Sequence, residues 1–328
     1  MSQHTATEEV PSPRIKGVKK QSKVNPVYKF LRDHVHITAN ELRQEWSQDG
    51  AVKDKLASRN KGVRCFMKLG DIFPDDGKKL QDAIHNFQVP ESVTQVHFSD
   101  LTAVETACEL CLEENHLVAL YAPSSTPVKT IYGGLPCELT DLAIRSTFLR
   151  QLKSPSLHLS ESDKLCELYV KTSFYVPQVE VRKAGYTQDF ADLEQSDRKD
   201  LNVVLMSQVE SVLNHLEENS DQEVKLSKLI YFRLLVPFMM ALRQNQNRQK
   251  LNESRKDSGA PILNPIRHIV IGDMGLRCKE SGVNTLYAQR LKSIIEQFDG
   301  CFDSVTICGP DTLRMHVELF FKNSDNKN

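Results

Sequence analysis

The sequence predicts an α/β fold: a layered, partly parallel, Rossmann-like sheet flanked by helices. Two segments that alternate strand, helix and strand support this fold class. The clearer one lies within residues 266–311 and joins an apolar run (268–271), a helical pattern (285–298) and a β-branched run (303–308). A unit of this kind pairs its two strands in parallel through a right-handed crossover. The second unit has the same order, with a strand at 93–98, a helix at 101–115 and a strand at 117–121.

Other elements follow from apolar periodicity and from capping signals along the chain. Thr38 and Glu41 have capping-box spacing, which predicts a helix from there to about residue 57. Residues 244–258 are polar and are expected to be a frayed helix end or a mobile insertion loop. The remaining expected strands are 63–69 and 176–181, and the remaining expected helices are 80–87, 138–153, 160–171, 197–218, 224–243 and 312–321.

Composition shifts divide the chain into three expected parts. Residues 1–25 are polar and basic and are predicted to be a disordered tail. A boundary is expected near Pro155, within residues 154–160, so that residues 26–155 form an N-terminal α/β subdomain and residues 156–328 a C-terminal α/β domain.

Charge and hydropathy exclude several classes of protein. The 328 residues include 42 basic and 43 acidic side chains, a balance that does not favour nucleic-acid binding except through the basic tail. The first 24 residues lack the apolar core of a signal peptide, and the apolar cluster 234–242 is too short to span a membrane. The eight cysteines are expected to be reduced thiols. The expectation is an intracellular protein, cytoplasmic or nuclear, without a membrane segment.

The candidate ligand site lies where the strands of the first unit end. Gly272, Asp273 and Gly275 follow one strand, and Asp311 follows the other. Ligands of parallel α/β sheets bind beyond the carboxyl ends of the strands, so these four residues are the predicted cofactor-binding residues. The spacing matches neither the dinucleotide fingerprint nor the Walker motif, so the cofactor stays unknown and the glycines could simply form a turn. The two aspartates could bind a metal or share a proton, or could be solvated loop carboxylates.

No catalytic residues and no metal ligands are predicted. A G-x-S-x-G motif is absent, and no nucleophile stands out. Cys108 and Cys111 fall in the middle of an expected helix, where they are predicted to be core thiols. His34 and His36 could share one face of a strand but have no third ligand near them in the sequence.

The C-terminal half resembles the sensitivity-to-red-light-reduced-like domain family. The resemblance rests on the aromatic strand at 174–177, the strand and glycine turn at 269–276, the Tyr-x-Gln pair at 287–289, and the Pro/Asp pair at 310–311. The family's turn is usually Gly-Leu-Gly and its later pair Asp-Pro, so this sequence departs at both places. The resemblance implies an intracellular regulatory protein with a nucleotide-fold-like domain and no established reaction.

The predicted function is therefore an intracellular regulatory or interaction protein with a protein partner and no evident catalytic constellation. The alternative is an enzyme, for example a transferase, that binds a nucleotide-like cofactor or another small-molecule ligand at residues 272–275. A third hypothesis is nucleic-acid association through the basic tail.

Overall fold

A computed structural model of the chain describes residues 64–66, 69–73, 78–110, 115–122, 137–151, 173–185, 188–209, 222–276, 281–309 and 311–325. Within these residues a seven-stranded sheet has the order β1-β4-β5-β3-β6-β7-β2. Strands β5, β3, β6, β7 and β2 are parallel, whereas β4 is antiparallel to both of its neighbours. The strands are β1 (Arg64–Phe66), β2 (Gln95–Ser99), β3 (His116–Ala122), β4 (Ser173–Val181), β5 (Lys199–Ser207), β6 (His268–Ile271) and β7 (Ser304–Cys308).

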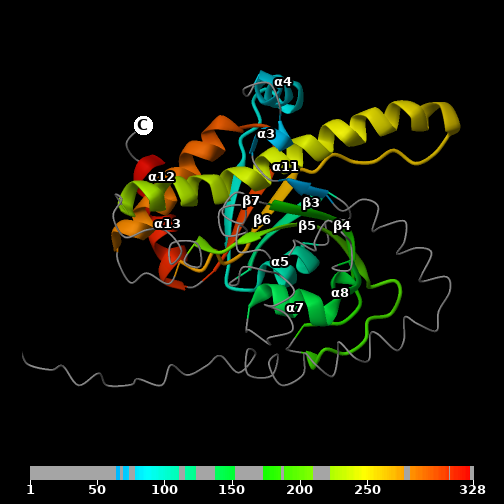
Figure 1. Cartoon of the computed structure of the whole chain (residues 1–328), viewed down its shortest axis with the longest axis horizontal. Helices are drawn as coiled ribbons and strands as arrows, with labels where there is room; N and C mark the ends of the chain where they lie inside the picture. The colour runs from blue at the N-terminus through cyan, green and yellow to red at the C-terminus, as the bar shows by residue number, and fades with distance from the viewer. Residues whose placement is uncertain are drawn as a thin grey trace, which may run out of the picture.

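Helices cover both faces of this sheet, which confirms the predicted α/β fold class (Figure 1). One face packs against α5 (Ala103–Glu109), α7 (Glu138–Arg145) and α8 (Phe148–Gln151). The other packs against α3 (Leu69–Ile72), α4 (Lys78–Phe87), α11 (Gln222–Ser258), α12 (Ser281–Gln297) and α13 (Asp311–Asp325). Strand β3 illustrates the two cores, because Val118 and Leu120 contact the first helical layer and Leu117 and Tyr121 the second.

Strands from both sides of residue 155 are interleaved in the sheet. Strand β3 lies between β5 and β6, although it belongs to the expected N-terminal part and its neighbours to the C-terminal part. Residues 1–63, which include the expected basic tail, His34, His36 and the capping box at Thr38, lie outside the described residues, as does the expected boundary at 154–160.

The first predicted unit is confirmed as β6, α12 and β7. The expected helix at residues 197–218 is wrong over its first half, because residues 199–207 form strand β5. Helices cover β5 on both faces, so six consecutive residues, 201–206, are all buried. A strand covered on both sides reads as a continuous apolar run, and its two-residue alternation is lost from the sequence.

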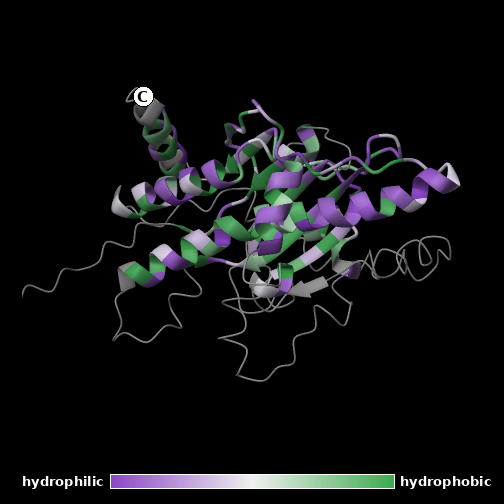
Figure 2. Cartoon of the chain, turned by 90° about the horizontal axis from the view of Figure 1, so that it is seen from above, coloured by the Kyte–Doolittle hydropathy of each residue, from purple (hydrophilic) through white to green (hydrophobic). Residues whose placement is uncertain are grey.

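Residues 244–258 are neither frayed nor a loop but the second half of α11, a 37-residue helix. Figure 2 shows that this half is mostly hydrophilic and extends away from the sheet. Although α11 is long, neither it nor another helix in the described residues is apolar enough to cross a membrane.

Side chains on one stripe of α11 hold the chain that returns to β6. The amides of Asn245 and Asn252 each bond the backbone N–H and C=O of one residue, Ile266 and Leu263 respectively, at 2.6–2.9 Å. Arg248, between the two asparagines, donates to the backbone carbonyl of Asn264. Arg255, one turn after Asn252, donates to that of Pro261. Each amide therefore satisfies an extended backbone as a neighbouring strand would.

We expect Asn245→Ala to lower the free energy of unfolding by roughly 2–4 kcal/mol, since it leaves a buried N–H and a buried C=O of Ile266 without partners. Urea denaturation would measure the loss. Asn247→Ala is the matched control, because the hydrogen bond that its amide makes within the described residues, to Gln244, is long at 3.5 Å, and it should change stability by less than about 0.5 kcal/mol. Equal effects from the two substitutions would contradict a role for the amide stripe.

Candidate functional site

The carboxyl end of β3 is the point at which the chain connections diverge. The chain leaving β3 reaches α7 on one face of the sheet, whereas the chains leaving its neighbours β5 and β6 reach α11 and α12 on the other face. In parallel α/β sheets, a ligand-binding crevice typically forms at the carboxyl ends of adjacent strands whose connections leave on opposite faces. The topology therefore favours ligand binding at the ends of β3, β5 and β6.

Glu138, the first residue of α7, joins three elements at the carboxyl ends of these strands. Its Oε1 accepts a hydrogen bond from the backbone N–H of Ala103 (2.8 Å) at the start of α5. Its Oε2 accepts another from the backbone N–H of Asp273 (3.0 Å), just after β6. The carboxyl group thus connects two helices of one layer with the turn that follows the central strands.

Burial raises the pKa of the Glu138 carboxyl to about 8. The two backbone N–H donors oppose that shift, while the negative charges of Asp273 and Asp141 add to it. The group is therefore largely a neutral carboxylic acid at neutral pH, and such an acid can donate a proton. Within the described residues, the Glu138 carboxyl accepts both hydrogen bonds, from the N–H groups of Ala103 and Asp273. Neither bond therefore involves the acidic proton of the carboxyl group.

The glycine turn packs directly against this carboxyl. A Cβ on Gly272 would lie 2.1 Å from Oε2 of Glu138 and 3.0 Å from the carbonyl oxygen of Ala119. Gly275 has a φ of 73°, a left-handed conformation that glycine adopts without strain. The turn is closed by the N–H of Gly275, which donates to Oδ1 of Asp273 at 2.8 Å. Both glycines are therefore required by the geometry of the turn.

Strand β5 also places polar groups beside the glycine turn. The N–H of Val209, just beyond β5, donates to the carbonyl of Met274 in the glycine turn at 3.1 Å. On the α11 side, the buried Arg233 donates to the backbone carbonyl and the hydroxyl of Ser207 at the end of β5. The hydroxyl of Tyr121, near the end of β3, donates to the carbonyl of Arg233. Polar groups from three elements are thus fixed at this edge.

A second buried carboxylate lies one turn further along α7. Asp141 pairs with Arg145 at 3.3 Å, and both side chains are buried. Burial raises the pKa of Asp141, whereas Arg145 and the Thr102 hydroxyl lower it. Burial also raises the pKa of Glu105, which lies on α5 beside this pair. The positive charge of Arg145 opposes the effect of burial and lowers the pKa of both Asp141 and Glu105.

The structure brings together three of the four predicted site residues. Gly272, Asp273 and Gly275 form one turn. Asp311 begins α13 after the neighbouring strand β7, and its side chain lies outside the described residues. Sequence reasoning missed Glu138, although an acidic residue that opens a helix after a strand and a Gly-Gly loop was a usable signal.

The cysteines and metal candidates contribute no further site. Cys108 lies in α5 and Cys111 outside the described residues. Burial raises the pKa of the Cys308 thiol to about 12, which keeps it protonated and unreactive. Across the described residues, no group of three or more histidine, cysteine, aspartate or glutamate side chains could hold a metal ion.

Several solved structures with a similar fold are of poly(ADP-ribose) glycohydrolases. The poly(ADP-ribose) glycohydrolase of Deinococcus radiodurans in complex with ADP-ribose superposes with a TM-score of 0.53 and 18% identity, covering 80% of this chain and 95% of that one. The glycohydrolase of Thermomonospora curvata bound to the inhibitor ADP-HPD gives a TM-score of 0.53 and 13% identity, covering 88% and 98%. The chain has the fold of these glycohydrolases. No protein-family model and no curated protein matches its sequence.

These structures correct the predicted function. A non-enzymatic regulatory or interaction protein is wrong as the first choice, because the similar structures are of an enzyme, in one case with ADP-ribose bound. They agree better with the alternative, an enzyme that binds a nucleotide-like ligand at the glycine turn. The resemblance to the sensitivity-to-red-light-reduced-like family is not tested by these structures and stays a prediction, whereas the regulatory function that it implied is contradicted.

We expect Gly272→Ala to destabilise the protein by about 1–3 kcal/mol, because its Cβ would collide with the Glu138 carboxyl and the Ala119 carbonyl. Thermal or urea unfolding would measure the change. Gly282→Ala, in α12, is the matched control: its Cβ would meet no atom within 4 Å, and alanine should stabilise that helix by up to about 1 kcal/mol. A Gly272→Ala protein as stable as the native one would refute the packing of the turn against Glu138.

The raised pKa of Glu138 predicts how stability changes with pH. The unfolded chain releases this proton near the ordinary pKa of 4.5, but the folded chain keeps it until about pH 8. Stability from this group is therefore complete below the unfolded pKa and falls as pH rises towards the folded one. The stability advantage of the native protein over Glu138→Gln should shrink between about pH 5 and pH 9, as measured by urea denaturation. An advantage that grows with pH would show that the carboxyl is ionised in the folded state.

Proposed function

We propose that the protein binds an ADP-ribosyl group at the carboxyl end of β3 and hydrolyses its glycosidic bond, with Glu138 as the proton donor. The observation that carries the proposal is the Glu138 carboxyl, buried and neutral, held between Ala103 and Asp273 at the sheet edge where the connections diverge. The similar fold of a glycohydrolase complexed with ADP-ribose supports the choice of ligand.

The glycine turn positions the proposed proton donor. The side chains of Glu138 and Gln208 lie where Cβ atoms of Gly272 and Gly275 would be, and the turn is fixed by Asp273 and by Val209, just beyond β5. A preformed turn of this kind holds the Glu138 carboxyl in a fixed position, as a proton donor requires.

A neutral carboxyl suits glycoside hydrolysis. The acid donates its proton to the oxygen that leaves the anomeric carbon as the glycosidic bond breaks. Water then adds its oxygen to that carbon and returns a proton to the carboxylate, so that the acid is restored. A raised pKa is what keeps the donor protonated at neutral pH before each turnover.

We expect the purified full chain to bind ADP-ribose in isothermal titration calorimetry and to release ADP-ribose from poly(ADP-ribose), measured by chromatography. Glu138→Gln should lower the rate by about 10²-fold or more, because the amide has no acidic proton, while ADP-ribose affinity changes far less. The native rate should fall as pH rises through about 8, where the donor loses its proton. Glu109→Gln, which changes an exposed carboxylate on α5, should leave the rate unchanged.

The outcomes separate binding from catalysis. Binding without turnover in the native protein would make it an ADP-ribose-binding module and would contradict the hydrolase. A Glu138→Gln protein that retains the native rate would remove Glu138 from the reaction. A folded native protein that neither binds ADP-ribose nor releases it would overturn the proposal as a whole.

A further inference from the structure

Strand β2 is an edge strand of the sheet formed by the described residues, and its outer side is called the open edge below. It is the last strand in the sheet order and pairs with β7 on one side only, and no described strand pairs with its outer side. In Figure 1 it is the cyan strand beside β7. An uncovered edge presents backbone donors and acceptors to which another strand can pair. This feature is independent of the ADP-ribose proposal.

The hydrogen bonds to β7 show which backbone groups of β2 face outward. The N–H of Gln95 donates to the carbonyl of Asp303, which precedes β7, so the backbone groups of Gln95 face β7. Successive residues of a strand direct their N–H and C=O groups to opposite sides. Those of His97 and Ser99 therefore also face β7, and those of Val96 and Phe98 face the open edge.

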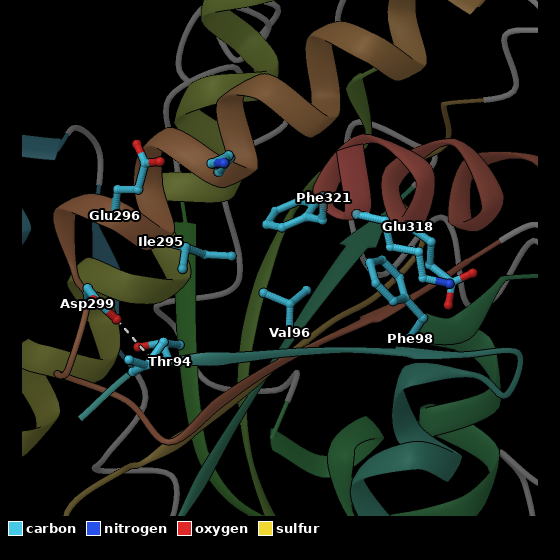
Figure 3. Close-up of a pocket in the computed structure, with 11 residues that line it drawn as sticks. Thr94, Val96, Phe98, Ile295, Glu296, Asp299, Glu318 and Phe321 are labelled. Atoms are coloured by element: carbon cyan, nitrogen blue, oxygen red, sulfur yellow. Dashed lines mark hydrogen bonds between the residues drawn. The ribbon is translucent and has the colours of Figure 1, made fainter. Parts of the chain in front are cut away.

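The side chains of Val96 and Phe98 line a groove on the face covered by α12 and α13. The groove has a volume of about 470 Å³, and Ile295 and Phe321 form its apolar wall (Figure 3). Its charged residues include two of each sign on the two helices, namely Lys292, Lys322, Glu296 and Glu318. The groove is therefore apolar within and mixed in charge at its sides, which does not favour a strongly acidic or basic partner.

The β2 sequence has the same pattern in both directions about His97. It reads Gln95, Val96, His97, Phe98, Ser99, that is polar, apolar, histidine, apolar, polar. If a second β2 lies antiparallel on a two-fold axis through His97, Val96 of each copy faces Phe98 of the other. Both residues have outward backbone groups, so each such pair can exchange two hydrogen bonds. The apolar side chains also meet on the same face, the favourable arrangement for cross-strand pairs.

We propose that two copies of this chain associate through antiparallel pairing of their β2 strands, with the two-fold axis at His97. The second copy's Val96 and Phe98 extend the apolar surface at the mouth of the groove. The groove of each copy carries both lysines and glutamates, so neither copy presents charge of one sign only to the other. Such an isologous interface is the commonest arrangement in homodimers.

The test uses the charge at the two-fold axis. His97 is exposed and faces its own counterpart in the proposed dimer, so His97→Glu and His97→Lys each place like charges opposite one another. Light scattering after size exclusion should find the native full chain dimeric, each variant monomeric, and an equal mixture of the two variants dimeric again. The matched control changes another exposed histidine, His85 on α4, to glutamate, and this variant should stay dimeric.

A backbone variant checks the same contact by other means. Val96→Pro removes an N–H that faces the open edge and leaves the β7 pairing of Gln95 and His97 in place, so it should abolish the dimer while circular dichroism shows a folded chain. A native chain that is monomeric at the highest soluble concentration would overturn the proposal. So would a dimer that survives both His97→Glu and Val96→Pro.

Discussion

The arrangement at the carboxyl ends of the central strands depends on the hydrogen bonds of the Glu138 carboxyl. They join the start of α5, the start of α7 and the turn after β6, which are far apart in the sequence. Removing them would leave two backbone N–H groups unpaired in a region that water reaches poorly, at a cost of roughly 1–3 kcal/mol each. The same burial keeps the carboxyl neutral. One side chain therefore holds α5, α7 and the glycine turn together and also supplies the proposed chemistry.

The topology explains why the carboxyl end of β3 is suited to a ligand. The chain leaving β3 reaches α7 on one face of the sheet, and the chains leaving β5 and β6 reach α11 and α12 on the other face. The glycine turn, the end of β5 and Glu138 meet where these connections diverge. Poly(ADP-ribose) glycohydrolases with the same fold show that the architecture accommodates ADP-ribose in those proteins.

The sequence predicted those parts of the fold in which local pattern and environment agree. The run His268–Ile271, the helix after it and the strand at Ser304–Cys308 are bounded by glycine or proline and have clear periodicity. Strand β5 was mistaken for a helix because both of its faces are buried. The glycine turn was found from its own residues, but its partner Glu138 was not. The hydrogen bond between Glu138 and Asp273 spans 135 residues, and no local pattern records such a contact.

The most direct test of this account is an amide NMR titration of the isotope-labelled protein with ADP-ribose. Binding at the proposed site predicts that the largest shifts occur at Gly272–Leu276, at Ala103 and near Gln208, which surround the Glu138 carboxyl and the end of β5. The amides of Val96 and Phe98, at the open edge of the sheet, should be unaffected. Absence of shifts at saturating ligand, or shifts confined to residues away from the glycine turn, would contradict the central claim.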